Sequence, residues 1–359
     1  MKKKEQELFL QLCRHQTPDK KKLKKLLESG YATTEVLGTL FENRMAAIAY
    51  DVLEKNELLE NVGREFRNAL RNAHIANWKW NEDFIGCLRH VSAVLDSADI
   101  PYALLKGAVL VGKYPLGCRT SNDIDVLIAP EHVGRVCAVL TQAGFRQGEV
   151  KNNTFIPATR QQIIESKMMR GETVPFIKEV KLPFMRYLEV DLNFSLDYKN
   201  SDGIMLKKML ERTELVEVGM AKIKSLNRLD FILHLCAHLY KEATTLPWII
   251  MKRDMTFYKY CDIYTRLPRL NHEDSIELCR LAKAYHLEEE FFYCLDSVNA
   301  FFGLNHSYLE DALKNYDNTH FGDVIAPAEK KLYRYTEADP VNRFFSSNRK
   351  RLLLEVTTV

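Results

Sequence analysis

The sequence predicts an α+β protein in which a small mixed β-sheet is flanked by amino-terminal and carboxy-terminal helical regions. Two observations support this fold class. Apolar residues recur at helical spacing from residue 5 to about residue 98 and again beyond about residue 203, and the segment between them alternates short strand-like and helical stretches. A chain of 359 residues with 46% apolar content exceeds one compact domain. We therefore expect three domains, at 1–98, 99–202 and 203–359.

The amino-terminal segment, 1–98, is expected to form an all-helical arm. It contains no proline after Pro18, and its apolar residues recur three and four positions apart, as at Phe41 and Met45. A second apolar stripe runs from residue 84 to residue 95 and stops before Pro101. Because proline does not continue a helix, we expect the arm to end there and a strand to begin.

The middle segment, 99–202, is expected to hold a mixed α/β core. Tyr102–Leu105 and Asp123–Ile128 are predicted strands, and residues 108–114 have room for one or two helical turns. A helix after the second strand is expected to stop at Gly144. Residues 146–180 fit a helix or a strand, and the pattern leaves that choice open.

A further strand is predicted in the segment YLEVDLNFSL. Its strict alternation places one set of side chains in the core and the other set on the opposite face. The opposite face is polar, so we expect this strand to carry functional groups. The apolar set is Leu188, Val190, Leu192 and Phe194, and the polar set is Glu189, Asp191 and Asn193.

The carboxy-terminal segment, 203–359, is expected to be a helical domain that ends in a polar tail of about twenty residues. Asn227 with Asp230 resembles a helix start. His234 and His238 lie four positions apart on one helix face, which is the spacing of two zinc ligands. No HExxH glutamate accompanies them, and the alternative is that they pack or hydrogen-bond on a helix face. If they serve the reaction, we expect them near the nucleotide, together with Asp262, and not on zinc.

Composition and charge argue against several classes of protein. The 51 basic and 48 acidic residues leave a net charge of +3, which does not indicate a dominant nucleic-acid surface, and the lysine clusters at 2–4 and 20–22 are interpreted as solvated faces. The eight cysteines form no CxxC pair, so neither a zinc ribbon nor a disulfide framework is expected. With no apolar run of about 18 residues, we expect a soluble, unprocessed, cytoplasmic protein that does not enter membranes.

Three aspartates form the candidate catalytic group. Asp123 and Asp125 are two positions apart on a predicted strand, so their carboxylates leave the same face and repel each other unless a cation joins them. Mg²⁺ prefers such oxygen ligands, and Asp191 adds a third carboxylate from another strand. In a two-metal site Asp125 would bridge both ions and Asp123 would share them. Asp191 would bind the second ion and help to deprotonate an acceptor hydroxyl. Glu189 lies on the same face as Asp191 and is the reserve candidate for this group. The alternative is an Asp-x-Asp pair on a solvated strand end.

Candidate phosphate ligands precede the aspartates. In LLKGAVL a strand runs into Lys106, Gly107 and Ala108 and then a helical turn, whose amides would cradle phosphates while the glycine permits close approach. Arg119 would bind the β- or γ-phosphate as a planar donor. Lys106 would contact a phosphate or, alternatively, extend to the surface.

The stretch LLKGAVLVGKYPLGCRTSNDIDVLI resembles the signature of the uncharacterised nucleotidyltransferase family of the polymerase β superfamily, in the order Lys-Gly, Tyr-Pro, Arg and Asp-x-Asp. The later Val190-Asp191-Leu192 matches the superfamily's third carboxylate. This resemblance implies two Mg²⁺ ions, with Mn²⁺ as a substitute, and ATP or another nucleoside triphosphate as substrate. Two departures stand out: Ala108 replaces a serine that usually touches a terminal phosphate, and Asn193 stands where relatives often have histidine.

The expected reaction is transfer of a nucleoside monophosphate to an acceptor hydroxyl with release of pyrophosphate. The acceptor is unknown, and a small molecule, peptide or protein is favoured over nucleic acid. One alternative, for which Ala108 is the argument, is a non-catalytic nucleotide-binding or scaffold protein that keeps the fold. Another, a phosphotransferase, lacks support because neither a Walker A loop nor an HRD-like segment is present. The sequence leaves the oligomeric state open.

Overall fold

The computed structural model describes residues 1–196 and 203–356. Within them the chain forms two compact units, one made of Met1–Ala73 together with Ile232–Val359 and the other of His74–Phe231. Helices and strands occur in both, and the larger sheet is mixed, which confirms the predicted α+β class. The predicted division at 1–98, 99–202 and 203–359 follows changes in composition and stays a prediction.

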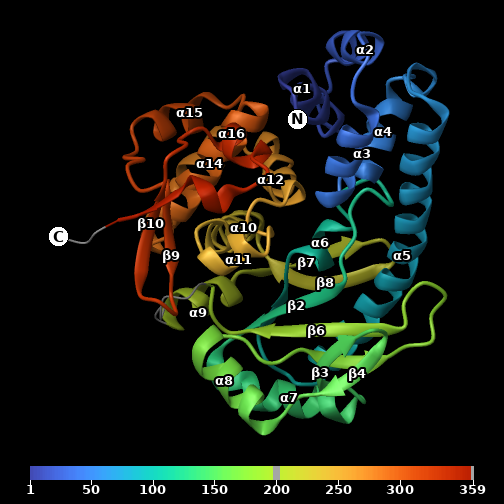
Figure 1. Ribbon diagram of the computed structural model, residues 1–359. Helices are drawn as coiled ribbons and strands as arrows, with labels where there is room; N and C mark the ends of the chain where they lie inside the picture. Colours follow the sequence, from blue (N-terminus) through green and yellow to red (C-terminus); the bar gives the residue numbers. More distant parts are fainter. Residues whose placement is uncertain (197–202, 357–359) are drawn as a thin grey trace. The chain divides into compact units, whose positions relative to one another are not determined.

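The unit His74–Phe231 is built on a mixed sheet (Figure 1). Among the described residues this sheet has eight strands in the order β4-β3-β5-β6-β2-β1-β8-β7. The pairs β2–β6 and β1–β8 are parallel and the others are antiparallel. The strands are β1 (Tyr102–Leu104), β2 (Asp123–Ile128), β3 (Arg146–Lys151), β4 (Thr154–Pro157), β5 (Phe176–Glu179), β6 (Tyr187–Asn193), β7 (Thr213–Val218) and β8 (Ala221–Leu226).

Helices of this unit follow the predictions closely. The turns expected at 108–114 correspond to a short helix, and the helix expected to stop at Gly144 ends just before that residue, whose φ is +88°. The open segment 146–180 contains two strands, a helix that begins with a Thr159–Gln162 capping box, and a third strand. The helices are the later part of α5 (Arg64–Asp96), α6 (Gly107–Leu110), η2 (Pro130–His132), α7 (Val133–Gln142), α8 (Arg160–Arg170) and α9 (Gly203–Glu211).

Strands β7 and β8 lie where the sequence analysis expected helix, so that expectation is wrong for residues 213–226. Val216, Val218 and Ile223 alternate with exposed or half-buried residues and are buried, and Gly219 adopts φ +55° in the turn between the strands. The hairpin extends the sheet because β8 pairs with β1. The hydrophobic period of two was present in the sequence, and the stronger helical pattern after it concealed it.

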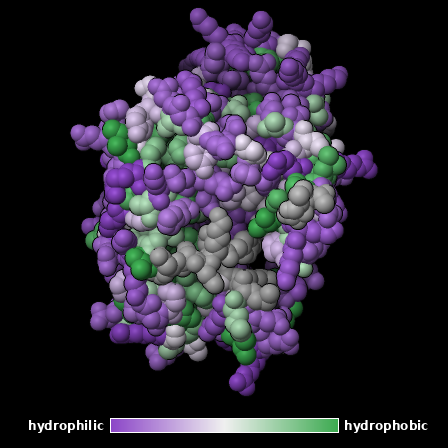
Figure 2. Space-filling model, turned by 90° about the vertical axis from the view of Figure 1, so that its left-hand side faces the viewer, coloured by the Kyte–Doolittle hydropathy of each residue, from purple (hydrophilic) through white to green (hydrophobic). Residues whose placement is uncertain are grey.

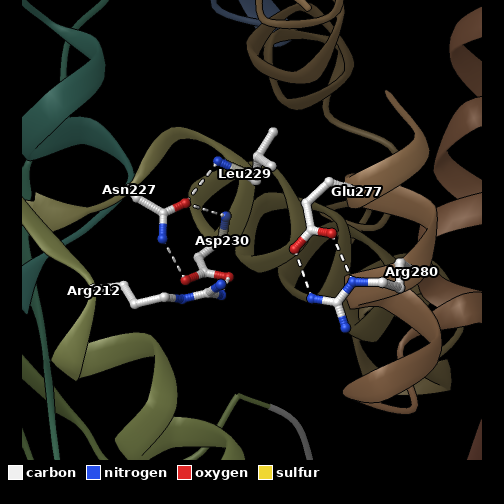
Figure 3. Close-up of polar contacts among 6 residues, drawn as sticks. All are labelled: Arg212, Asn227, Leu229, Asp230, Glu277 and Arg280. Carbon is white, nitrogen blue, oxygen red and sulfur yellow. Dashed lines mark hydrogen bonds and ion pairs between the residues drawn. The ribbon is translucent and has the colours of Figure 1, made fainter. Parts of the chain in front are cut away.

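The helix start predicted at Asn227 is confirmed (Figure 3). Its side-chain oxygen accepts hydrogen bonds from the backbone amides of Leu229 and Asp230 at 3.0 and 3.1 Å. Its amide nitrogen donates to the carboxylate of Asp230 at 2.7 Å, and the guanidinium of Arg212 pairs with the same carboxylate. Asp230 is fully buried, and Arg212 compensates its charge while Asn227 satisfies a further hydrogen-bond acceptor.

The other unit is mainly helical. Among its described residues it also holds a three-stranded antiparallel sheet in the order β11-β10-β9. Its helices before residue 74 are α1 (Lys3–Leu12), α2 (Lys20–Glu28), α3 (Thr33–Glu42), α4 (Ala46–Lys55), η1 (Leu59–Asn61) and the start of α5. Its later elements are α10 (Arg228–Ala243), α11 (Leu246–Ile250), α12 (Phe257–Tyr264), η3 (Leu267–Arg269), α13 (His272–Ala284), α14 (Glu288–Phe302), α15 (Ser307–Lys314), β9 (Asp323–Ala326), β10 (Lys331–Tyr335), α16 (Pro340–Phe345), η4 (Arg349–Leu352) and β11 (Leu353–Glu355).

Aromatic packing joins the two parts of this unit. The ring of Phe257 lies 4.9 Å from Phe9 and 5.1 Å from Phe301, measured between centroids. Near the end of the chain, Arg349 makes two hydrogen bonds, of 2.6 and 2.7 Å, to the fully buried Asp254. The prediction of a polar tail is therefore wrong as far as residue 356, because these residues pair and pack instead.

The lysine cluster at 20–22 lies on a solvated face, as predicted, and in the cluster at 2–4 Lys2 and Lys3 are exposed while Lys4 is half-buried. Lys20, Lys21 and Lys22 are exposed, whereas Leu23 and Leu26 of the same helix, α2, are buried. Figure 2 shows mostly hydrophilic side chains over the face that it presents, with hydrophobic ones in small separate groups. In the described part of the chain, no helix combines the length and the apolar character needed to cross a bilayer.

Candidate functional site

Two parallel strands bring the predicted carboxylates together. In the register of β2 and β6, Asp125 lies opposite Asp191, and Asp123 lies opposite Glu189. Because alternate side chains of a strand share a face, all four carboxylates leave the same side of the sheet. The intervening apolar residues are buried on the other side. A one-residue slip of register would therefore turn these apolar side chains out of the core. The polar face predicted for β6 is confirmed.

Burial and mutual repulsion perturb these carboxylates. Burial raises the pKa of Asp191 well above its ordinary value, and the charges of Asp125 and Asp123 raise it further. The pKa of Asp125 is raised for the same reasons, although the nearby Lys106 opposes the shift. Burial, with the two β2 aspartates adding, raises the pKa of Glu189 from 4.5 to about 7. Such a group of carboxylates favours either protons or a divalent cation.

Lys106 points inward to this group. Its Nζ donates to Asp125 Oδ1 at 2.7 Å, and its side chain is only 19% exposed. Burial lowers the pKa of Lys106, but the attraction of Asp125, Asp123 and Asp191 outweighs it and the net shift is upward. The alternative that Lys106 extends to the surface is therefore wrong, and its contact with phosphate stays a prediction. Asn193 also donates to Asp125 Oδ1, at 3.4 Å.

The donor set fits a hard divalent cation. Asp191 Oδ1 is buried and has no hydrogen-bond partner among the described residues, and an orphan carboxylate oxygen in a group of like charges matches a cation. The geometry is not a finished coordination sphere: no group of three histidine, cysteine or carboxylate side chains surrounds one point in the ranges described above. Lys106 forms an ion pair with Asp125 and so offsets part of the negative charge of the carboxylate group.

Gly107 is needed for a reason that the sequence did not reveal. A Cβ on this residue would lie 2.0 Å from Ser121 Oγ, so the glycine makes room for a serine. The Ser121 hydroxyl donates to Asp123 Oδ1 at 2.9 Å, and the Ser121 carbonyl accepts from Trp80 Nε1 at 2.7 Å. Ala108 is fully buried beside the turn. Ser121 thus orients the Asp123 carboxylate and Trp80 holds Ser121 in place, and the sequence signal for Ser121 was its position two residues before Asp123.

Arg119 lies in the loop between α6 and β2. It is 7% exposed, its guanidinium donates to the carbonyl of Thr120, and its own carbonyl accepts from Asn81 Nδ2 at 3.1 Å. Asn81, on α5, is fully buried and anchors the loop. The structure therefore holds Arg119 firmly, four residues before Asp123, and its role toward a phosphate stays a prediction.

A pocket adjoins the β6 carboxylates. Its volume is about 560 Å³, and Glu189 and Asp191 form part of its wall. The remaining wall comes from β3, β4, α8 and the segment 172–175, all within the same unit. Gly148 on β3 is required there because a Cβ would lie 2.2 Å from the Ile156 carbonyl oxygen. The site thus combines a carboxylate group with a cavity of the size that small ligands occupy.

The family model described as uncharacterised nucleotidyltransferase matches residues 32–303, which is more than half of the chain. The chain belongs to this family. All the candidate site residues lie within the matched range. Family membership supports nucleotidyl transfer as the general chemistry of the site.

Comparison with individual proteins adds little detail. No curated protein matches the chain. Among solved structures, the chain is similar to an antigenic nucleotidyltransferase-like protein from Paracoccidioides brasiliensis, with 14% identity and a TM-score of 0.35, over 65% of this chain and 93% of that one.

His234 and His238 lie on α10 in the helical unit of this nucleotidyltransferase-family chain. Their rings are stacked with centroids 6.5 Å apart, and His234 is 4% exposed. His238 Nε2 lies 3.5 Å from Glu242, which also pairs with Lys259. These contacts agree with the packed helix face that was the alternative to a zinc site.

Proposed function

We propose that the protein is a metal-dependent nucleotidyltransferase of the polymerase β superfamily that transfers a nucleoside monophosphate from a triphosphate, ATP in the first place, to an acceptor hydroxyl. The observation that carries the proposal is the parallel pairing of β2 and β6, which sets Asp125 opposite Asp191 and leaves Asp191 Oδ1 without a partner among the described residues. A solvated Asp-x-Asp pair does not explain this arrangement, because Asp125 is only 4% exposed. The family match supports the same chemistry.

Asp123, Asp125 and Asp191 would hold two Mg²⁺ ions, or Mn²⁺ in their place. When bound, these ions would neutralise phosphate charge and stabilise the attacking and leaving oxygens. Asp191 would accept the proton of the acceptor hydroxyl as its oxygen bonds to the α-phosphorus. The bond from the α-phosphorus to the bridging oxygen then breaks, and pyrophosphate leaves with the electron pair. Lys106 and Arg119 would supply positive charge to the leaving phosphates.

A second candidate, nucleotide binding without transfer, is favoured by one observation. Ala108 is fully buried and offers no hydroxyl where the superfamily usually has a serine. The two candidates differ in their products, because only transfer attaches an α-labelled nucleotide to an acceptor. Attachment of a γ-label instead would indicate a phosphotransferase.

The first test is calorimetric binding of each of the four nucleoside triphosphates with and without Mg²⁺. We expect magnesium-dependent binding by the wild type and at least a tenfold loss in the Asp123→Asn, Asp125→Asn double variant. Asp99→Asn is the matched control, because Asp99 is exposed in the same unit and its φ of +48° suits asparagine. Absence of magnesium-dependent binding by the wild type to all four triphosphates would overturn the proposal.

A further inference from the structure

The charged side chains among the described residues that line the pocket beside Asp191 are all acidic. Among the described residues that line it are five carboxylates, and lysine, arginine and histidine are absent from that lining. The five are Glu149, Glu165, Glu172, Glu189 and Asp191. Glu149, Glu165 and Glu172, which do not belong to the carboxylate group of β2 and β6, would repel a triphosphate, because its own charge has the same sign. The nucleotide's phosphates therefore belong on the side of Lys106, and the pocket is left for the other substrate.

Two of the outer carboxylates, Glu149 and Glu165, are only weakly compensated. Glu149 pairs with Lys151 at 2.5 Å, but the two side chains are 48% and 62% exposed, and ion pairs so exposed contribute little. Glu165 accepts a hydrogen bond from Gln161 at 2.7 Å, which adds no charge. The pocket rim thus retains a negative potential that would attract a cation.

A buried hydroxyl in the same wall independently indicates a ligand. Thr173 is 2% exposed, lines the pocket, and its Oγ1 has no hydrogen-bond partner in the part of the chain that the structure describes. Its backbone amide donates to the Leu192 carbonyl at 2.9 Å, which holds Thr173 beside β6, the strand that carries Asp191. Buried polar groups are normally satisfied, so this hydroxyl is suited to a polar ligand group.

The rest of the lining is partly apolar. It includes Ile156, Pro157, Ala158, Val174 and Pro175, together with the polar Gln162 and Ser166. A volume of about 560 Å³ lies within the range of roughly 300–1,000 Å³ that small-molecule sites occupy. This volume suits a small molecule with some hydrocarbon surface.

We propose that this pocket binds the acceptor and that the acceptor is a small cationic alcohol, carrying at least one ammonium group besides the hydroxyl that reacts. This inference rests on the proposed function. The ammonium group would lie among Glu149, Glu165 and Glu172, with Thr173 donating to or accepting from a polar group of the ligand. The reacting hydroxyl would face Asp191, which takes its proton while the oxygen bonds to the α-phosphorus and pyrophosphate leaves.

The test uses calorimetry on the full chain in 0.15 M salt with four probes: spermidine, glucosamine, glucose and gluconate. Glucosamine and glucose share one ring and differ by one ammonium group, and gluconate carries the same six carbons as an open-chain anion. We expect glucosamine to bind at least tenfold more tightly than glucose, gluconate to bind least, and spermidine to bind more tightly than glucosamine. The Glu149→Gln, Glu165→Gln double variant should weaken spermidine binding at least tenfold and leave Mg·ATP binding unchanged.

Two controls separate the pocket from general surface charge. A Glu214→Gln, Glu217→Gln double variant removes two exposed carboxylates from β7 and should bind spermidine like the wild type. Thr173→Val removes the orphan hydroxyl at constant shape, so it should keep the wild-type melting temperature while weakening glucosamine binding.

Each outcome addresses one of the two proposals. If Mg·ATP binds but neither amine does, or glucosamine binds no better than glucose, or both double variants weaken spermidine equally, the cationic acceptor is refuted while the nucleotidyltransferase remains. If the amines bind but Mg·ATP does not, the proposed function fails and the pocket's role as an acceptor site fails with it.

Discussion

Replacing Gly107 with alanine tests the packing that holds the strand-to-helix turn against the aspartates. The new Cβ would lie 2.0 Å from Ser121 Oγ and 2.3 Å from Ser121 Cβ, far inside van der Waals contact. Ser121 is held at both ends: its hydroxyl donates to Asp123 at 2.9 Å, and its carbonyl accepts from Trp80 at 2.7 Å. Relief of the clash therefore requires a hydrogen bond to break or the turn to move.

The magnitude follows from these contacts. Overpacking of a tight site costs about 1–3 kcal/mol, and loss of a hydrogen bond to a charged group costs about 1.5–3 kcal/mol. Alanine offsets at most about 1 kcal/mol through its better helix propensity. We expect Gly107→Ala to lower the free energy of unfolding by about 2–4 kcal/mol.

The assay is a double-mutant cycle with Ser121→Gly, which removes both clashing atoms. Urea unfolding is followed by tryptophan fluorescence, to which Trp80 contributes from beside Ser121, and by circular dichroism. In the Ser121→Gly background the alanine should cost little, so we expect a coupling free energy of about 2 kcal/mol or more. An equal loss of stability from the alanine in both backgrounds would refute the reasoning, as would a Gly107→Ala variant as stable as the wild type.

Three further predictions concern stability. Because folding raises the pKa of Glu189 from 4.5 to about 7, the metal-free protein should lose stability as the pH rises through that window. Glu189→Gln should remove at most about 3 kcal/mol of this loss above pH 7 and change nothing near pH 4. Urea unfolding measured across this pH range checks the prediction, with the exposed Glu214→Gln variant as the control. Equal stability of variant and wild type at pH 8 contradicts it. Arg349→Met leaves Asp254 buried and unpaired, so we expect a loss of about 3–5 kcal/mol, partly recovered by adding Asp254→Asn; a loss below 1 kcal/mol would count against the pair. Asn227→Ala should cost about 0.5–2 kcal/mol for the lost cap in thermal or urea unfolding, and more because the amide donor to buried Asp230 is lost as well. Asn227→Ser keeps the capping oxygen but not that donor, so it should lie between the alanine variant and the wild type, and equal effects of the two variants would argue against capping.

Local periodicity was enough to predict several parts of the site. The alternation in YLEVDLN dictates that Glu189 and Asp191 share a face, and the spacing of Asp123 and Asp125 does the same on β2. The cap at Asn227 and the glycine stop at Gly144 were equally local, because each depends on a few neighbouring residues. These features hold for a strand or a helix wherever the element lies.

Competing local patterns defeated the prediction elsewhere. The hairpin of β7 and β8 carries a period of two, but it is short and precedes the strongly helical α10, so the region was expected to be helical. The end of the chain is polar in composition, yet Arg349 hydrogen-bonds to the carboxylate of Asp254, about a hundred residues earlier in the sequence. Composition alone does not report such partners.

Tertiary structure decided what local pattern cannot encode. The sequence by itself determined that β2 and β6 each carry carboxylates on one face; only the fold decided that these strands pair in parallel with Asp125 opposite Asp191. It also brought Lys106 to Asp125, Ser121 to Gly107, and the acidic walls of the pocket together. The physical reason is that side-chain direction follows from backbone period within one element, whereas pairing, burial and the resulting pKa shifts depend on which distant elements share the core.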